Sequence, residues 1–302
     1  MGCAINSLAF PVPQLPQSFY ETLLLRRSDL IWLETDLGER IPACYVRAPK
    51  PPQDEGNGPN MTLLYSHGNA EDIGQHLDYI DALSLHTGAD VLSYEYLGYS
   101  LSRLEGSEAS EAGCLRSIDA AWKYCVDKMK IPPSQIVIYG RSIGSGPSVD
   151  LASRDVVEGC SGSPKDAKGV LLQSPLESGA RAVFGSVASC IGYPLDIFRN
   201  YEKIGKITAP VAIMHGTVDE VVPVANGKAL HQMAQRPFEP FWIEGYGHNN
   251  MPQDLCFRYA RSFLKHLQKD RSRPSRNDRK NRLSDGGAVF DKQGGKTVRV
   301  KC

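Results

Sequence analysis

Short runs of branched and aromatic apolar residues recur along the chain, separated by stretches with an apolar residue every three or four positions. The runs predict buried strands, and the stretches between them predict helices. We expect strands at 61–66, 90–96, 136–139, 169–174, 210–215 and 240–244, and helices at 73–87, 108–129, 148–154, 225–234 and 254–267. Strands that alternate with helices in this way predict an α/β protein with a mostly parallel central sheet and helices on both of its faces.

The remaining segments set the predicted domain boundaries. Residues 30–47 have the pattern of a β-hairpin, and the Pro, Gly and Asn residues of 50–60 mark a surface loop. Residues 175–207 lack a regular pattern and stand where a small cap segment is expected. We therefore predict an N-terminal arm at 1–27, one folded domain at 28–269 and a disordered tail at 270–302, where apolar periodicity is missing.

The strand at 136–139 leads directly into Gly140-Arg141-Ser142-Ile143-Gly144, and a helical stretch follows. Strand, G-x-S-x-G and helix make up, in this order, the nucleophile elbow of the α/β-hydrolase fold. The serine of such an elbow sits on a strained turn at the edge of the sheet, so its neighbours must be small. Gly140 and Gly144 meet this need. Ser142 is therefore the candidate nucleophile.

Two other interpretations compete for this segment. G-x-S-x-G also occurs by chance in ordinary loops. A dinucleotide-binding fingerprint built on Gly144 and Gly146 would need a third glycine where Val149 stands, and Pro147 occupies the position where its helix should open. The dinucleotide interpretation is rejected. The assignment of Ser142 as the nucleophile still needs catalytic partners at the ends of other strands.

Two later strands end in the groups that such a serine requires. Asp219 follows the strand at 210–215, and His248 follows the strand at 240–244, which produces the chain order Ser, Asp, His used by α/β-hydrolases. Open α/β sheets place their active sites at these carboxyl ends of strands. We predict that Ser142 attacks an acyl carbonyl, that His248 moves its proton, and that Asp219 orients the imidazole.

The acid and the histidine each have rivals. Glu220 and Asp196 are alternative acids, because a single Asp in a loop after a strand is more often a turn or cap residue. His67 and His215 also end strands, but each directly precedes a glycine and neither lies downstream of the acid. We interpret these two histidines as structural.

An acyl-transfer site also needs two backbone N–H donors for the oxyanion. One is predicted to be the N–H of Ile143, directly after the nucleophile. The other should come from the loop after the strand at 61–66, where we favour Asn69 and keep Ala70 as the alternative.

Composition narrows the class of protein. The chain has 302 residues, 41% of them hydrophobic, and its formal net charge of zero offers no global attraction to nucleic acid. No stretch approaches the length of a membrane-spanning helix. The tail is different, because residues 270–302 carry ten Lys or Arg against four Asp or Glu. The body is therefore mildly acidic and the tail basic.

The cysteines and the N-terminus suggest where the protein works. Eight cysteines are scattered without a C-x-x-C pair or a histidine cluster, which disfavours a zinc site and a disulfide scaffold, and we expect neither metal nor cofactor. The N-terminus lacks the pattern of a signal peptide. It reads Met1-Gly2-Cys3 instead, which places a possible myristoylation site at Gly2 and a possible palmitoylation site at Cys3. An accidental MGC is the alternative, because Asn6 stands where the usual pattern has Ser or Thr.

Several motifs together resemble the α/β-hydrolase domain-containing 17 family. They comprise residues 67–72 (HGNAED), 139–144 (YGRSIG), 149–153 (VDLAS), 215–222 (HGTVDEVV) and 247–249 (GHN). The apolar segment before the domain, Leu8-Ala9-Phe10 followed by prolines, is similar as well, and the resemblance covers about residues 8–269. It implies a serine esterase on the cytoplasmic face of the plasma or endosomal membrane that removes palmitate from S-acylated membrane proteins.

The chain also departs from that family. The family has an N-terminal cysteine cluster for membrane targeting, and this chain has Cys3 alone. Residues 95–100 read EYLGYS, where the wider group has Asp-Tyr-x-Gly-Tyr-Gly, and the basic tail is extra. Three functions stay open on the residues: a palmitoyl-protein thioesterase, a carboxylesterase or monoacylglycerol-type lipase, and a non-catalytic membrane-docking protein on a hydrolase fold. A cytosolic location is the alternative to membrane association.

Overall fold

The computed structural model describes residues 9–49, 61–188 and 196–270, with the backbone alone for 184–188. Gly2, Cys3, nearly all of the basic tail and part of the expected cap segment lie outside these ranges. No helix in the described ranges combines the length and the apolar character needed to cross a membrane.

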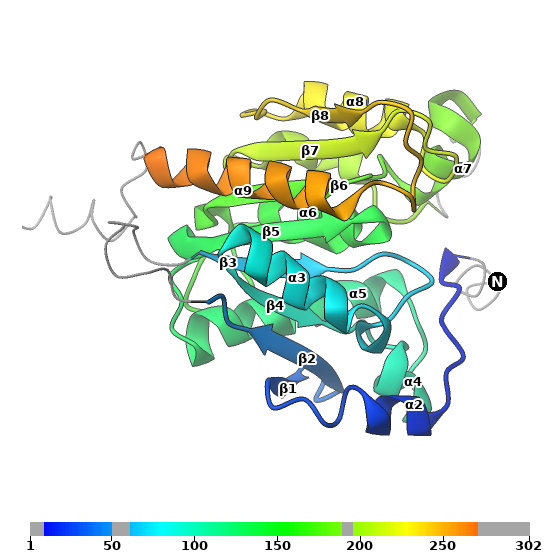
Figure 1. Ribbon diagram of the computed structural model, residues 1–302, viewed down its shortest axis with the longest axis vertical. Coiled ribbons are helices and arrows are strands. Elements are labelled where there is room, and N and C mark those ends of the chain that lie inside the picture. Colours follow the sequence, from blue (N-terminus) through cyan, green and yellow to red (C-terminus); the bar gives the residue numbers. More distant parts are fainter. Residues whose placement is uncertain (1–8, 50–60, 189–195, 271–302) are drawn as a thin grey trace, which may run out of the picture. The chain divides into compact units, whose positions relative to one another are not determined.

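The described residues form an eight-stranded sheet (Figure 1). Its strands are β1 (Leu30–Glu34), β2 (Arg40–Val46), β3 (Thr62–Ser66), β4 (Asp90–Tyr94), β5 (Ile136–Arg141), β6 (Gly169–Gln173), β7 (Val211–Gly216) and β8 (Phe241–Ile243). They lie in the order β1-β2-β4-β3-β5-β6-β7-β8. β2 runs antiparallel to both of its neighbours, and all pairings from β4 to β8 are parallel. The predicted α/β-hydrolase architecture, with a mostly parallel sheet, is confirmed.

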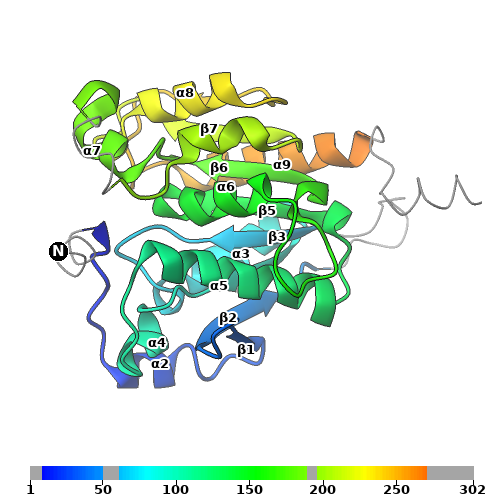
Figure 2. The same ribbon diagram turned by 180° about the vertical axis from the view of Figure 1, so that it is seen from behind.

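Helices cover both faces of this sheet. They are α2 (Gln17–Thr22), α3 (Leu77–Thr87), α4 (Ser100–Leu104), α5 (Glu111–Lys123), α6 (Ser145–Ser153), α7 (Gly179–Ala188), α8 (Val224–Met233) and α9 (Gln253–Lys269). Figure 1 shows α3 and α9 on one face, and Figure 2, seen from behind, shows α5, α6 and α8 on the other.

β5 shows how the apolar run at its centre builds both cores. Ile136 and Ile138 point into the core under α5 and α6, whereas Val137 and Tyr139 point into the core under α3 and α9. Side chains of a strand alternate between its two faces, so an uninterrupted apolar run is what a strand buried on both faces requires. This central position places the following turn, with Ser142, at the middle of the carboxyl edge.

The structure differs from the predicted elements in three places. The segment 175–207, expected to be irregular, contains α7, and Asp196 Oδ1 accepts a 2.7 Å hydrogen bond from the Ala180 backbone N–H at the start of this helix. The helix expected at 73–87 is a 3₁₀ turn (Ile73–Gln75), capped by Asp72, followed by α3. The two are separate because the backbone of His76, with φ of −117° and ψ of 23°, leaves the helical conformation between them. The predicted arm includes α2, whose Tyr20 is fully buried against the domain.

Candidate active site

Ser142 stands at the end of β5, where the strand passes into a 3₁₀ turn (Ser142–Gly144) and then into α6. Its backbone has a φ of +53°, in the left-handed region that non-glycine residues rarely adopt. The chain packs tightly around this turn, since a Cβ on Gly144 would lie 2.3 Å from the Ser66 carbonyl oxygen. A Cβ on Gly140 would lie 2.5 Å from the Gly144 carbonyl oxygen. Both glycines of G-x-S-x-G are therefore required by close backbone approach.

The structure brings the three predicted catalytic residues together. His248 Nε2 lies 2.9 Å from Ser142 Oγ, and His248 Nδ1 lies 2.7 Å from Asp219 Oδ2. Each of these residues is at most 7% exposed. A histidine whose Nδ1–H donates to a carboxylate presents an unprotonated Nε2, which can accept the hydroxyl proton of the serine.

The surroundings of Asp219 stabilise its charged form. Asp219 Oδ1 accepts the backbone N–H groups of Val221 and Val222 at 3.0 and 2.7 Å. His215 Nε2 lies 3.2 Å from Oδ2. Burial acts to raise the pKa of Asp219, but the hydrogen bonds from His215, His248 and Val222 outweigh burial and hold the pKa well below its usual range. Asp219 therefore stays ionised at neutral pH.

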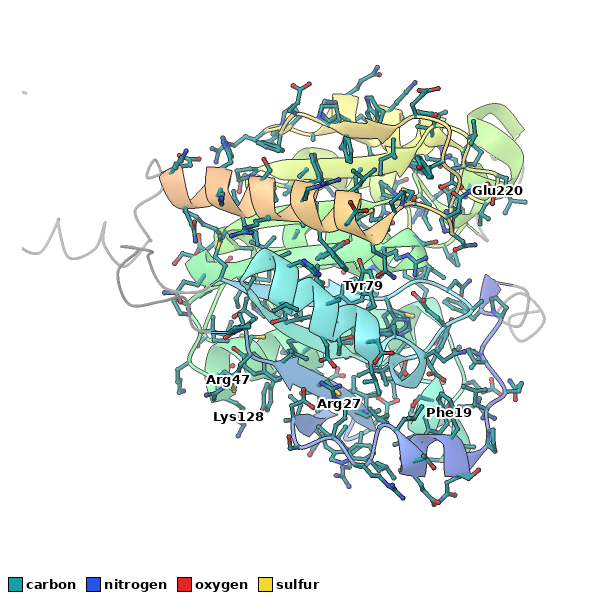
Figure 3. The ribbon with its side chains drawn as sticks, in the orientation of Figure 1. Phe19, Arg27, Arg47, Tyr79, Lys128 and Glu220 are labelled. Carbon is teal, nitrogen blue, oxygen red and sulfur yellow. The ribbon has the colours of Figure 1, made fainter. Side chains whose placement is uncertain are left out.

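The rival acids are placed elsewhere. Asp196 holds the start of α7, and Glu220, labelled in Figure 3, has an exposed side chain in the loop after β7. His67 has the structural place expected of it, since its Nε2 is 2.9 Å from Glu95 Oε1 in a fully buried pair. His215 is likewise buried, with its Nε2 hydrogen-bonded to the Val222 carbonyl oxygen, and its ring also contacts the carboxylate of Asp219, which the sequence did not predict.

The loop after β3 is positioned by its own side chains. Asn69 Nδ2 donates to the Ala9 carbonyl oxygen at 2.7 Å, and Tyr99 Oη donates to Asn69 Oδ1 at 2.7 Å. The backbone N–H of Asn69 forms no hydrogen bond with any residue in the described ranges, so this donor is available. The assignment of Asn69 and Ile143 to the oxyanion hole stays a prediction.

Known proteins resemble this chain in sequence. Alpha/beta hydrolase domain-containing protein 17B of Xenopus tropicalis is 41% identical over 219 residues, which cover 72% of this chain and 68% of that protein. The human 17B protein is 40% identical over the same shares of the two chains, and the mouse 17C protein is 39% identical over 68% of this chain and 60% of its own. The chain belongs to the alpha/beta hydrolase domain-containing protein 17 family. No protein-family model matches it.

Solved structures agree on the fold of this family member. A putative lipase of Acinetobacter baumannii superposes with a TM-score of 0.57 over 86% of this chain and 99% of its own, at 14% identity. An esterase of Thermogutta terrifontis superposes with a TM-score of 0.54 over 79% of this chain and 92% of its own, at 13% identity. At this identity the likeness concerns the fold alone.

Two charged residues that the sequence interpretation left without a role connect the loops around Ser142. Arg141 Nη1 lies 2.7 Å from Glu71 Oε1, and Glu71 Oε1 also accepts the Gly68 N–H at 2.8 Å. Arg141 Nη2 donates to Asn249 Oδ1 at 3.3 Å. Burial acts to raise the pKa of Glu71, but the charge of Arg141, together with His76, His67 and the Gly68 N–H, outweighs burial and holds the pKa below its usual range. The ion pair therefore ties the loop after β3 to the elbow and to the histidine loop.

A buried polar cluster lies behind this ion pair. His67, Glu71 and His76 each offer a ligand atom within 4.8 Å of the others, a spacing found in metal sites. The Glu71 carboxylate already forms an ion pair with Arg141, and both ring nitrogens of His67 contact protein oxygens. Burial lowers the pKa of His76 to about 3, so this ring is neutral. The described contacts fit a hydrogen-bonded support for the loop after β3 better than a cation site.

Proposed function

We propose that this protein is a serine hydrolase that cleaves palmitoyl thioesters from S-acylated membrane proteins. The continuous chain of hydrogen bonds from Asp219 through His248 to Ser142, at the end of the central strand, supports the proposal most. The choice of a palmitoyl thioester follows the family resemblance, since Ser142 would open oxygen and sulfur esters by the same chemistry.

The reaction that we propose has two halves. Ser142 Oγ attacks the acyl carbonyl while His248 Nε2 takes its proton, and the tetrahedral oxyanion faces the Ile143 and Asn69 N–H groups. The carbon–sulfur bond then breaks, and His248 delivers the proton to the departing cysteine thiolate. In the second half His248 removes a proton from water, the hydroxide attacks the acyl-enzyme, and Ser142 regains its proton as the fatty acid leaves.

The decisive experiment compares substrates on one purified protein. Wild type is assayed on an S-palmitoylated peptide, on monopalmitoylglycerol and on a short-chain ester, with Ser142→Ala as the blank. We expect the palmitoylated peptide to have the highest kcat/KM. A preference for the glycerol ester or the short-chain ester would assign the protein to lipases or carboxylesterases. Failure of a fluorophosphonate probe to label Ser142 would favour the third function, a non-catalytic docking protein.

We further propose that the protein attaches to the cytoplasmic face of membranes through acylation of Gly2 and Cys3. A single acyl chain holds a protein to a membrane only marginally, so a second chain or a basic segment is needed. The ten Lys and Arg residues of 270–302 supply such a segment. Cys3→Ser should move the protein from the membrane to the soluble fraction of cells, while its activity on a soluble ester stays unchanged. An equal distribution of the variant and wild type would contradict this proposal.

A further inference from the structure

A small polar hollow opens beside His248. Its polar lining consists of Tyr79, Arg141, Gln173, His248, Asn249 and Gln253, and Met251 and Cys256 complete it. Tyr79, labelled in Figure 3, comes from α3, and Gln253 begins α9. The hollow measures about 70 Å³. This is room for about two water molecules or one small polar group, since a water takes about 30 Å³ of the liquid.

Gln173, the last residue of β6, directs a hydrogen-bond donor into this hollow. Its Oε1 accepts hydrogen bonds from Tyr139 Oη at 2.6 Å and from Tyr79 Oη at 3.4 Å, which sets the orientation of the amide. The residue is only 5% exposed. Its Nε2 forms no hydrogen bond with any residue of the described part of the chain. The N–H₂ group is therefore accessible from the hollow, where a ligand that accepts a hydrogen bond can replace solvent at this donor.

Arg141 adds further donors to the same hollow. Its bonds to Glu71 and Asn249 use only part of the N–H groups of the guanidinium. Because the carboxylate of Glu71 balances its positive charge, the site offers hydrogen-bond donors with little net charge. Such a site suits a neutral acceptor, such as a carbonyl oxygen, better than a carboxylate.

Because His248 lines the hollow, the hollow lies on the side of the residue that protonates the leaving group of the substrate. His248 protonates the departing group, so that group must lie against the histidine when the acyl bond breaks. We propose that the hollow is the leaving-group subsite and that Gln173 and Arg141 bind a peptide carbonyl oxygen next to the cysteine that loses its acyl chain. This inference rests on the proposed function and specifies which part of the substrate the protein recognises outside the acyl chain.

Gln173→Glu tests the subsite with little change of shape. The new carboxylate still accepts the hydrogen bonds of Tyr139 and Tyr79, but it presents an acceptor to the hollow in place of a donor. We expect kcat/KM on an S-palmitoylated peptide to fall about tenfold, the size expected for one lost hydrogen bond and a new repulsion. On the palmitoyl thioester of a plain alkanethiol, which has no carbonyl in its leaving group, kcat/KM should stay within about twofold. Gln235→Glu adds the same charge to an exposed side chain after α8 and should change neither value.

Equal losses on the two thioesters would show that Gln173 only supports the fold or the histidine, and would overturn the subsite. A second measurement does not depend on turnover. A peptide with an S-hexadecyl cysteine, which cannot be hydrolysed, should protect Ser142 of wild type from a fluorophosphonate, and Gln173→Glu should weaken this protection about tenfold. Unchanged protection would also overturn the subsite. Wild type could fail to hydrolyse either thioester while the S-hexadecyl peptide still protects Ser142. This result would contradict the proposed function but not the subsite.

Discussion

His215 Nε2 lies 3.2 Å from Asp219 Oδ2, the same oxygen that His248 Nδ1 reaches at 2.7 Å. The Nε2 of His215 also lies 2.8 Å from the Val222 carbonyl oxygen. A nitrogen that approaches two oxygen acceptors carries the proton, so His215 donates to the Val222 carbonyl oxygen and turns the same N–H edge of its ring toward the carboxylate of Asp219. One carboxylate oxygen therefore contacts two histidines, and His215 positions the acid for His248.

We expect His215→Leu to lower kcat about tenfold and His215→Gln to keep most of the activity, because the Gln amide places a donor where Nε2 stood. Steady-state kinetics of the two variants on a soluble ester provide the measurement. Equal losses of kcat in His215→Leu and His215→Gln would show that His215 only packs.

Substitution of the two candidate acids, Asp219 and Asp196, should have very different effects on turnover. Asp219→Asn replaces the acceptor of the Nδ1–H by an amide and favours the wrong tautomer of His248. The loss of turnover should be on the order of 10⁴, as in the triad of a serine protease. Asp196→Asn keeps an oxygen that can accept the Ala180 N–H and should leave kcat unchanged. The reverse order of the two variants in a steady-state assay would exclude Asp219 as the acid.

Ser142→Ala should remove hydrolysis and fluorophosphonate labelling without unfolding the protein. The backbone φ of +53° at this position is strained for any residue with a Cβ. Ser142→Gly should therefore be more stable than Ser142→Ala by about 1 kcal/mol, measured by denaturant unfolding. Equal stability of the two variants would mean that the elbow stores no strain.

Ser100 is a second strained position, outside the active site. It has a φ of +47°, is fully buried, and its hydroxyl has no hydrogen-bond partner in the described ranges. It also stands where the wider group has the last glycine of Asp-Tyr-x-Gly-Tyr-Gly. We expect Ser100→Gly to raise the free energy of unfolding by about 1 kcal/mol, whereas Ser100→Ala, which keeps the Cβ, should not benefit from relief of strain. Thermal melts of the three proteins provide the measurement.

Asp72 should make stability depend on pH. Burial, with the nearby Glu95, raises the pKa of Asp72 to about 6. The folded state therefore binds the proton more tightly than the unfolded state, and the free energy of unfolding should fall as the pH rises from about 4 to about 6. The difference should be on the order of 2 kcal/mol, at about 1.4 kcal/mol per pKa unit.

Asp72→Asn is the control for this effect, since it cannot ionise. Its unfolding free energy, measured in urea from pH 4 to pH 8, should lack the decrease seen in wild type between pH 4 and pH 6. Parallel curves for the two proteins would assign the pH dependence to other groups.

Much of the fold and the principal candidate residues follow from local patterns in the sequence. The apolar run of β5 could only be buried on both faces, and the glycines on either side of Ser142 predicted a turn too tight for side chains. The alternation of strands and helices predicted the parallel sheet. Because parallel strands end at one edge, the same alternation predicted that Asp219 and His248 would meet the serine. These features depend on residues close together in the chain, or on the direction of strands.

Other features depended on contacts between distant residues. Arg141 pairs with Glu71 seventy positions away, and the interpretation of His215 as structural missed its contact with Asp219. Two tyrosines from other elements turn the Gln173 amide toward the hollow, and Asp196 was excluded as the acid only by its bond to α7. A hydrogen bond between side chains requires two atoms to lie within about 3 Å at a suitable angle. Strand order and the packing of helices on the sheet set such distances, and no local pattern of residues contains them.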